Sequence, residues 1–375
     1  MKTYRIVAIN LGSTSTKLCY YEDERCVISA SLPHSAEDLR EFSTIWEQEE
    51  LRTSAILNFL KKNHIAVKDL DAIVTRGGHT KPLVGGVYRV NEAMLAQSAS
   101  GKYGQHVTDL GLRIVYKLAA QGPLPLTVDP PTTDEFEALA RYSGLPELPR
   151  RSSFHALNHR AVGRQYARDI GRPYEELNLV VAHMGGGITV AAHRKGRMID
   201  ANNGITGDGP FSTNRCCTVP VGGLVEMCFS GKYTHQEMKR KLNGQGGMMA
   251  YLGENDALKV EQRAEAGDAQ CGEILDAMAY QTSKEIAGCA AVLCGKVDAI
   301  LITGGMAHSP RMTAFIKEHV GFIAPVHLYP GEYEMQSLCL NSLEALRGEQ
   351  PIQELRDRKE NHICCKVLPT WNNIF

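Results

Sequence analysis

Residues 177–203 read LNLVVAHMGGGITVAAHRKGRMIDANN, and this stretch indicates the fold. Asn178–Ala182 is a short apolar run rich in β-branched residues, which predicts a buried strand. The glycine triplet Gly185–Gly187 follows, and two further apolar runs, Ile188–Ala192 and Met198–Asp200, come next. Strand, glycine turn, strand, turn, strand is a β-meander rather than the strand–turn–helix of a P-loop or a dinucleotide-binding fold.

The glycine triplet removes every side chain from its turn. Because glycine tolerates positive φ and carries no Cβ, the backbone N–H groups of such a turn can approach a phosphate closely. A bare hairpin turn would have the same composition and needs no ligand. The stretch alone therefore leaves a phosphate-binding turn and a simple hairpin open.

A second copy of the pattern lies at the start of the chain. Tyr4–Leu11 reads as a strand, Gly12–Thr16 as a turn of small residues, and Lys17–Tyr21 and Cys26–Ala30 as further strands. Two meanders, each with a small-residue turn after its first strand, indicate a duplicated domain whose turns face each other across a cleft. The first turn is rich in hydroxyls, whereas the second is nearly all backbone.

The composition narrows the class of protein. The chain has 375 residues, of which 43% are apolar and 22% charged, and a net charge of −1. This balance gives no electrostatic reason to expect a nucleic acid or a membrane surface as partner. No run is long enough to span a membrane, and the first residues read as a strand rather than a signal peptide. The 11 cysteines include no CxxC pair, which favours reduced thiols in a cytoplasmic protein over a disulfide framework or a zinc site.

Helices and strands alternate after each meander, which predicts an α/β fold with mixed sheets. Helical periodicity predicts helices over Glu37–Asn63, Asp134–Tyr142 and Asp268–Leu293, and another that begins near Ser153. Gly144–Arg151 carries two prolines and is expected to be the first domain boundary.

Side chains suited to phosphate and carboxylate chemistry stand at the ends of predicted strands. Arg76 follows a short strand and precedes two glycines, and Asp129 ends another strand before two prolines. The motif FHALNHRAV places His155 and His159 four positions apart on one face of a predicted helix. Each has an ordinary alternative: a surface ion pair for Arg76, a turn-starting aspartate for Asp129, and packed or solvated imidazoles for the histidines.

At this point the chain resembles the acetate kinase family, and within it the butyrate kinases most closely, in the superfamily of sugar kinases, actin and heat-shock ATPases. INLGSTSTK resembles the family's first phosphate motif, AHMGGG its second, FHALNHRAV its histidine helix and LITGGM, with Gly304 and Gly305, its adenosine-side motif. The resemblance extends over nearly the whole chain. It implies a duplicated two-domain actin-like ATPase fold with a central cleft, built from residues 1–150 plus 331–375 and from residues 151–330.

The resemblance implies an enzyme that phosphorylates a short-chain fatty acid, butyrate first, with ATP as co-substrate and ADP and an acyl phosphate as products. An ionised carboxylate is already nucleophilic at pH 7, so no general base is required, and transfer needs chiefly positioning and charge neutralisation. Alternatives are a kinase for a branched acid such as isobutyrate or for acetate or propionate, and a non-enzymatic ATP-binding sensor. A homodimer or larger homo-oligomer is also expected.

The expected roles of the charged residues follow from the same resemblance. Arg76 would hold the substrate carboxylate, and Arg215 and His159 would meet the transferring phosphoryl group. Asp129 would orient Mg²⁺, directly or through water. His155 is expected to be mainly structural.

The second metal ligand is left open between two glutamates. An ungapped match puts Tyr333 where the family has its metal-binding glutamate, so Glu332 or Glu334 would take that role. The residues expected to bind ATP are Asn10, Ser13, Ser15, Lys17, His183, Gly185, Gly186, Gly187, Gly304 and Gly305.

Overall fold

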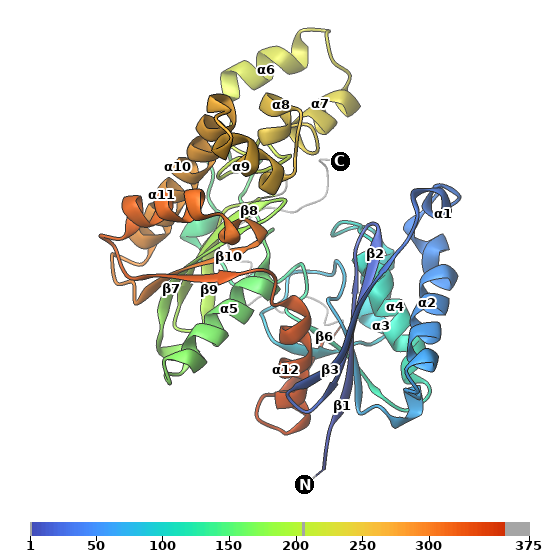
Figure 1. Cartoon of the computed structure of the whole chain (residues 1–375). Helices are drawn as coiled ribbons and strands as arrows, with labels where there is room; N and C mark the ends of the chain where they lie inside the picture. Colours follow the sequence, from blue (N-terminus) through green and yellow to red (C-terminus); the bar gives the residue numbers. More distant parts are fainter. Residues whose placement is uncertain (1, 205–206, 357–375) are drawn as a thin grey trace.

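The computed structural model describes residues 2–204 and 207–356, which form two mixed sheets with helices on both faces (Figure 1). The seven-stranded sheet has the order β12-β5-β6-β4-β1-β2-β3. Its strands are β1 (Arg5–Leu11), β2 (Ser15–Glu22), β3 (Arg25–Pro33), β4 (Ala72–Thr75), β5 (Val87–Arg89), β6 (Leu124–Val128) and β12 (Ile352–Glu354). The predicted α/β class with mixed sheets is confirmed.

The five-stranded sheet repeats the plan of the first, with the order β11-β10-β7-β8-β9. Its strands are β7 (Asn178–Met184), β8 (Ile188–Arg194), β9 (Arg197–Ala201), β10 (Ala299–Gly304) and β11 (Val326–Pro330). Each sheet contains an antiparallel meander, and parallel strands add beside the first strand of that meander: β4 beside β1, and β10 beside β7. Both meanders were predicted, and both are present.

Helices cover the outer face of each sheet. On the first sheet these are α2 (Glu49–Lys62), α3 (Glu92–Ala99) and α4 (Thr108–Ala119), whose apolar sides share a core with β1 and β4. On the second sheet they are α8 (Met248–Leu252), α9 (Ala257–Glu265), α10 (Ala269–Val292) and α11 (Pro310–Val320). Two more, α6 (Val221–Phe229) and α7 (His235–Leu242), lie beyond α10 at the top of Figure 1.

Two inner helices lie between the sheets. α12 (Glu334–Leu346) packs Leu338, Cys339 and Leu343 on the inner face of the first sheet. α5 (Ala156–Asp169) packs Val162 and Tyr166 on the inner face of the second. The two helices contact each other (Figure 1), so the halves of the molecule meet through α5 and α12. The division of the chain into domains 1–150 plus 331–375 and 151–330 stays a prediction, and its residues 357–375 lie outside the described residues.

The predicted helix over Glu37–Asn63 is wrong as a single element. The structure has α1 (Ala36–Arg40), a 3₁₀ turn η1 (Ile45–Gln48) and then α2. The break falls where the Glu47 carboxylate accepts from the Ser43 backbone N–H (2.9 Å) and the Thr44 hydroxyl (3.1 Å). Such local side-chain bonds compete with the helix for the backbone groups.

The predicted helix over Asp134–Tyr142 is also wrong, because only the 3₁₀ turn η3 (Leu139–Arg141) forms there. The polar groups of this segment are used by the second sheet instead. The Glu137 N–H donates to the Ile199 carbonyl (2.9 Å), and the Glu135 carboxylate accepts from the Met198 N–H (2.8 Å). The remaining 3₁₀ turns are η2 (Val67–Asp69), η4 (Tyr174–Glu176) and η5 (Gly305–His308).

The predicted helix near Ser153 begins later, at Ala156, and His155 is its N-cap. In the part of the chain that the structure describes, no helix has both the length and the apolar character needed to cross a membrane.

Candidate active site

The first small-residue turn joins β1 to β2, and a buried arginine holds it from behind. The Gly12 N–H donates to the Ser15 carbonyl (2.8 Å), which closes the turn. Arg52, on α2, donates to the carbonyl oxygens of Ser13 (3.2 Å) and Ser15 (3.3 Å) and to the Thr16 hydroxyl (3.3 Å). The turn's carbonyls, which would repel a phosphate, are therefore directed at the guanidinium.

Arg52 is 0% exposed, and burial lowers its pKa to about 10. Within the described ranges no carboxylate pairs with it, so its charge is compensated only by neutral oxygens. A guanidinium in this state favours an anion on the other side of the turn. Sequence reasoning missed Arg52; the one signal was a charged residue within the apolar stripe of a helix.

The second turn joins β7 to β8, and its glycines make room for a neighbour. The Gly185 N–H donates to the Gly187 carbonyl (3.1 Å). A Cβ on Gly187 would lie 2.3 Å from Nη1 of Arg215, and the same nitrogen donates to the Gly204 carbonyl (2.7 Å). The structure thus places Arg215 against the second turn. Burial lowers the pKa of Arg215.

The third turn, Gly304-Gly305, follows β10 and lies beside the second. Gly304 has φ +91°, and a Cβ there would lie 2.4 Å from the Met184 carbonyl oxygen, so only glycine fits. Gly304 and Gly331 exchange two backbone hydrogen bonds of 3.0 Å. This pairing brings the segment that carries Glu332 to the ends of β7 and β10.

Two glutamates of that segment reach the first sheet. The Glu334 carboxylate is 8% exposed, accepts from the Asn10 amide (2.9 Å) and lies 3.4 Å from Nη2 of Arg76. The half-exposed Glu332 carboxylate accepts from Lys17 (2.8 Å). Burial raises the pKa of Glu332, but the hydrogen bond and charge of Lys17 lower it more. The structure therefore gathers five predicted residues in one polar cluster.

Asn158 of α5 ties three elements together and was not predicted. Its amide donates to Nδ1 of His183 (2.8 Å) and to the Thr303 hydroxyl (3.3 Å), and its carbonyl accepts from the Tyr333 N–H (3.0 Å). It therefore fixes the ends of β7 and β10 relative to the segment before α12. The motif FHALNHRAV contained it, but its chemistry gave no separate signal.

The two motif histidines occupy different places. His155 is partly exposed, stacks on His183 with ring centroids 4.0 Å apart, and contacts the Thr189 hydroxyl through Nδ1 (2.9 Å). Burial lowers the pKa of His155 far below its usual range, and the charges of His183, Arg76 and Arg215 add to this effect. This imidazole therefore lies within the field of both arginines of the site.

His159 does not belong to that group. It is 0% exposed, packs edge-on against the Phe154 ring and reaches Thr189 from the core side through Nε2 (2.9 Å). The expectation that His159 meets the phosphoryl group, with His155 mainly structural, disagrees with this placement. The two histidines differ because His155 is the N-cap of α5 and precedes its first turn. It therefore does not share a helix face with His159.

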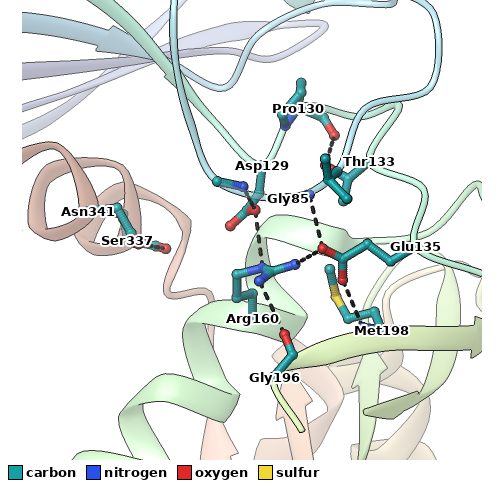
Figure 2. A network of polar contacts seen from close by, with 12 residues as sticks. Gly85, Asp129, Pro130, Thr133, Glu135, Arg160, Gly196, Met198, Ser337 and Asn341 are labelled. Atoms are coloured by element: carbon teal, nitrogen blue, oxygen red, sulfur yellow. Dashed lines mark hydrogen bonds and ion pairs between the residues drawn. The ribbon is translucent and has the colours of Figure 1, made fainter. Parts of the chain in front are cut away.

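Asp129 also lies apart from the polar cluster, in a buried ionic network (Figure 2). Its side chain is 0% exposed, and Oδ1 accepts from the Gly86 N–H (2.8 Å) and lies 3.1 Å from Nε of Arg160. Arg160 also donates to Glu135 (2.7 Å). Burial raises the pKa of Asp129, although the charge of Arg160 opposes this. Oδ2 of Asp129 is buried and has no hydrogen-bond partner among the described residues. The metal-orienting role of Asp129 stays a prediction.

The carboxylates of the site do not form a metal cage. Among residues 2–204 and 207–356 no three His, Cys, Asp or Glu side chains are grouped so that they could hold a metal ion. Glu332 and Glu334 each already contact a cation, Lys17 and Arg76 respectively. This donor set fits a Mg²⁺ ion that is bound mainly by nucleotide phosphates and needs few protein ligands.

Comparison with known proteins places these features in a family. The model of the acetokinase family matches residues 142–322. Butyrate kinase 2 of Clostridium acetobutylicum is 46% identical over 354 residues, which are 94% of this chain and 99% of that protein. A probable butyrate kinase of Clostridium botulinum is also 46% identical, over 93% of this chain and 98% of its own length.

The chain belongs to the acetokinase family. Solved structures agree on the fold: the acetate kinase of Porphyromonas gingivalis matches with a TM-score of 0.75 at 16% identity, over 89% of this chain and 98% of its own. A propionate kinase from Francisella tularensis matches with a TM-score of 0.72 at 17% identity, over 90% and 98%. The predicted family and the predicted actin-like ATPase fold class are confirmed.

Proposed function

We propose that this member of the acetokinase family is a butyrate kinase. A carboxylate oxygen of butyrate attacks the γ-phosphorus of ATP, the bond from that phosphorus to the β,γ-bridging oxygen breaks, and ADP and butyryl phosphate leave. The observation that carries this proposal is the 46% identity, over nearly the full length of both chains, with proteins named as butyrate kinases. The three small-residue turns at the ends of β1, β7 and β10 suit a nucleotide with its phosphates.

Different cationic groups of the site are proposed to bind the nucleotide phosphates and the acid. Lys17 and the backbone of the first turn would meet the nucleotide phosphates, with His183 and the glycines of the second turn opposite. Arg76 would hold the acid, because a guanidinium binds two carboxylate oxygens at once. The ion pair between Arg76 and Glu334 supports this role, because it shows that the guanidinium is accessible to a carboxylate.

His155 takes the role that the sequence suggested for His159. It lies in the field of Arg76 and Arg215, and burial together with those charges keeps its imidazole neutral at pH 7. A neutral imidazole can donate one hydrogen bond to an equatorial oxygen of the transferring phosphoryl group, and Arg215 can neutralise the charge on that group.

Mg²⁺ is proposed to enter with ATP, to bridge its phosphate oxygens and to neutralise their charge. Glu332 is the better candidate for its protein ligand, because that carboxylate is half-exposed whereas Glu334 is buried between Asn10 and Arg76. A cytosolic location and a homodimer or larger homo-oligomer remain part of the proposal.

A coupled assay of ADP formation with acetate, propionate, butyrate, isobutyrate and valerate tests the substrate. We expect the highest kcat/KM for butyrate. A higher value for isobutyrate, acetate or propionate would assign the chain to that acid, and no turnover with any acid would leave an ATP-binding sensor. Because one methylene changes binding by only ~1–3 kcal/mol, a preference of about tenfold is enough to decide.

Arg76→Lys tests the acid site separately. Lysine keeps the charge but loses the paired geometry, so KM for the acid should rise strongly while the affinity for ATP, measured by calorimetry, stays close to that of the unsubstituted protein. Unchanged kinetics in Arg76→Lys would remove Arg76 from the acid site.

A further inference from the structure

Behind His155 lies a row of buried polar side chains that the reaction itself does not use. β8 presents Thr189 and His193 on the same face, because they are an even number of residues apart, and α5 covers that face with His159. Tyr174 contacts His193 beyond them. Thr189, His159 and His193 are 0% exposed and Tyr174 is 4% exposed.

Three contacts of ordinary hydrogen-bond length connect most of this row. The Thr189 hydroxyl oxygen lies 2.9 Å from Nδ1 of His155 and 2.9 Å from Nε2 of His159. The Tyr174 hydroxyl lies 2.8 Å from Nδ1 of His193. If Thr189 accepted from both imidazoles, its own buried proton would have no acceptor in these contacts, so accepting from one ring and donating to the other is favoured.

The two inner imidazoles are not hydrogen-bonded to each other, although their ring centroids are 5.8 Å apart. Nδ1 of His159 and Nε2 of His193 are both buried, and neither has a hydrogen-bond partner among the described residues. His159, Thr189 and His155 therefore form one hydrogen-bonded row, and the Tyr174–His193 pair is separate from it.

We propose that His159, Thr189 and His155 form a one-directional row of donors that holds His155 as the neutral tautomer with its proton on Nε2. The row runs from His159 through Thr189 to His155. This inference rests on the proposed role of His155 toward the phosphoryl group, and it names His159 and Thr189 as positioning residues.

The direction follows from the unpartnered nitrogen of His159. If Nε2–H of His159 donates to the Thr189 hydroxyl, the Thr189 proton goes to Nδ1 of His155, and Nδ1 of His159 carries only a lone pair. Every buried hydrogen of the row then has an acceptor, and the proton of His155 lies on Nε2.

The opposite direction is less favourable. It would make His155 donate from Nδ1 and Thr189 donate to Nε2 of His159, so His159 would carry its proton on Nδ1, which is buried and has no acceptor among the described residues. A buried donor without a partner costs about 1–3 kcal/mol. The opposite direction would also turn a lone pair of His155, rather than an N–H, toward the phosphoryl oxygens, which are themselves acceptors.

The tautomer can be measured without substrate, on the full-length protein labelled with ¹⁵N in its histidines. There are 13 histidines, so the signal of His155 is assigned by its loss in His155→Gln. We expect the imidazole ¹⁵N shifts to place the proton of His155 on Nε2. A proton on Nδ1 would overturn the proposal, whatever acid the enzyme phosphorylates.

Thr189→Val removes the hydroxyl and keeps the shape of the side chain. We expect a mixture of His155 tautomers and a loss of kcat of about ten- to a hundredfold, the value of one hydrogen bond to a charged group. KM for ATP and for the acid should stay within about twofold, and Thr189→Ser should restore both the tautomer and kcat.

Thr282→Val is the matched control. Thr282 is another fully buried threonine, and its hydroxyl donates to the Met278 carbonyl within α10. The same chemical change there should leave kcat and the His155 signal as they are. If Thr189→Val lowers kcat but leaves His155 entirely in the Nε2–H form, Thr189 only supports the fold and the proposal is wrong.

His159→Phe keeps the proposal open to refutation if Thr189→Val does not fold. It removes the donor to Thr189 and keeps an aromatic ring at the buried position. We expect part of the His155 population to shift its proton to Nδ1, with a smaller loss of kcat than in Thr189→Val. An unchanged tautomer in His159→Phe would show that no directional row exists.

Discussion

The two phosphate-type turns have the same place in their sheets but are supported differently. The first turn carries hydroxyl side chains, and a buried guanidinium, Arg52, holds its carbonyls from behind. The second turn has no side chains, and Arg215 occupies the space that a Cβ on Gly187 would take. Each turn therefore has a cation next to it. At the first turn the cation is carried by α2, and at the second it fits because Gly187 has no side chain.

Gly187→Ala should have the largest effect, because it displaces Arg215. Its Cβ would lie 2.3 Å from Nη1 of Arg215 and 3.1 Å from the Gly204 carbonyl oxygen. Misplacing a charge-neutralising group by about 1 Å costs on the order of a hundredfold in rate, so kcat should fall by that factor in a steady-state assay.

Gly186→Ala sharpens this test, because a Cβ there meets nothing within 4 Å. Its loss of kcat should be much smaller. Equal losses in the two variants would mean that the backbone freedom of glycine, and not the room it leaves for Arg215, matters in the second turn.

Arg52→Gln should weaken ATP binding by about tenfold, the lower range for a charge-assisted interaction. Arg52→Lys keeps the charge and should lose less. Calorimetric titrations at several salt concentrations separate charge from structure, since only Arg52→Gln should reduce the dependence of log Kd on log salt. An equal salt dependence in both variants would show that Arg52 only holds the shape of the first turn.

Lys17→Ala should raise KM for ATP by several-fold and change KM for the acid little. The Lys17–Glu332 pair is about half-exposed, so urea unfolding should show a stability change of no more than about 1 kcal/mol. A rise confined to KM for the acid would move Lys17 from the nucleotide side to the acid side of the site.

The smallest expected effect is on the pH dependence of the protein's stability, through the buried histidines His183 and His193. Burial lowers the pKa of His183 to about 4 and that of His193 to about 3. Between those values and the ordinary histidine pKa the unfolded chain binds more protons than the folded one, so stability is lost as pH falls below about 6.5. Each histidine contributes at most about 1.4 kcal/mol per pH unit.

Urea unfolding at pH 7.5 and 5.5 measures that dependence. His193→Gln should reduce the difference between the two pH values, whereas His235→Gln, at an exposed position, should leave it unchanged. A difference that His193→Gln does not alter would place the proton uptake elsewhere in the molecule.

The sequence predicted the parts of the fold that depend on local pattern. Apolar runs interrupted by glycine were enough for both meanders. The helix predicted over Asp268–Leu293 begins after its capping residue, Asp268, whose side chain accepts from the Cys271 N–H. The helices predicted over 37–63 and 134–142 failed because their polar groups have other partners. For the second segment these lie in β9, far along the chain, where helical periodicity carries no information.

The sequence predicted which residues gather in the site better than it predicted the role of each residue. Asn10, Lys17, Arg76, Glu332 and Glu334 come together as one cluster because strand ends and the Gly331 turn bring them to the same edge. His155 and His159 could not be told apart by spacing, since the helix begins between them. The roles of Arg52 and Arg160 could not be predicted either, because their partners are a turn and a buried aspartate in remote parts of the sequence.

The position of α12 constrains how this chain can be synthesised. The inner face of the first sheet, including Ile6, Ala8 and Val74, is covered by residues 334–346. At ordinary translation rates roughly 15 to 55 s pass between the emergence of β4 and that of α12. During that interval the nascent chain exposes an apolar sheet surface, so the first half should depend on chaperones on the ribosome and a truncated chain that ends before α12 should aggregate.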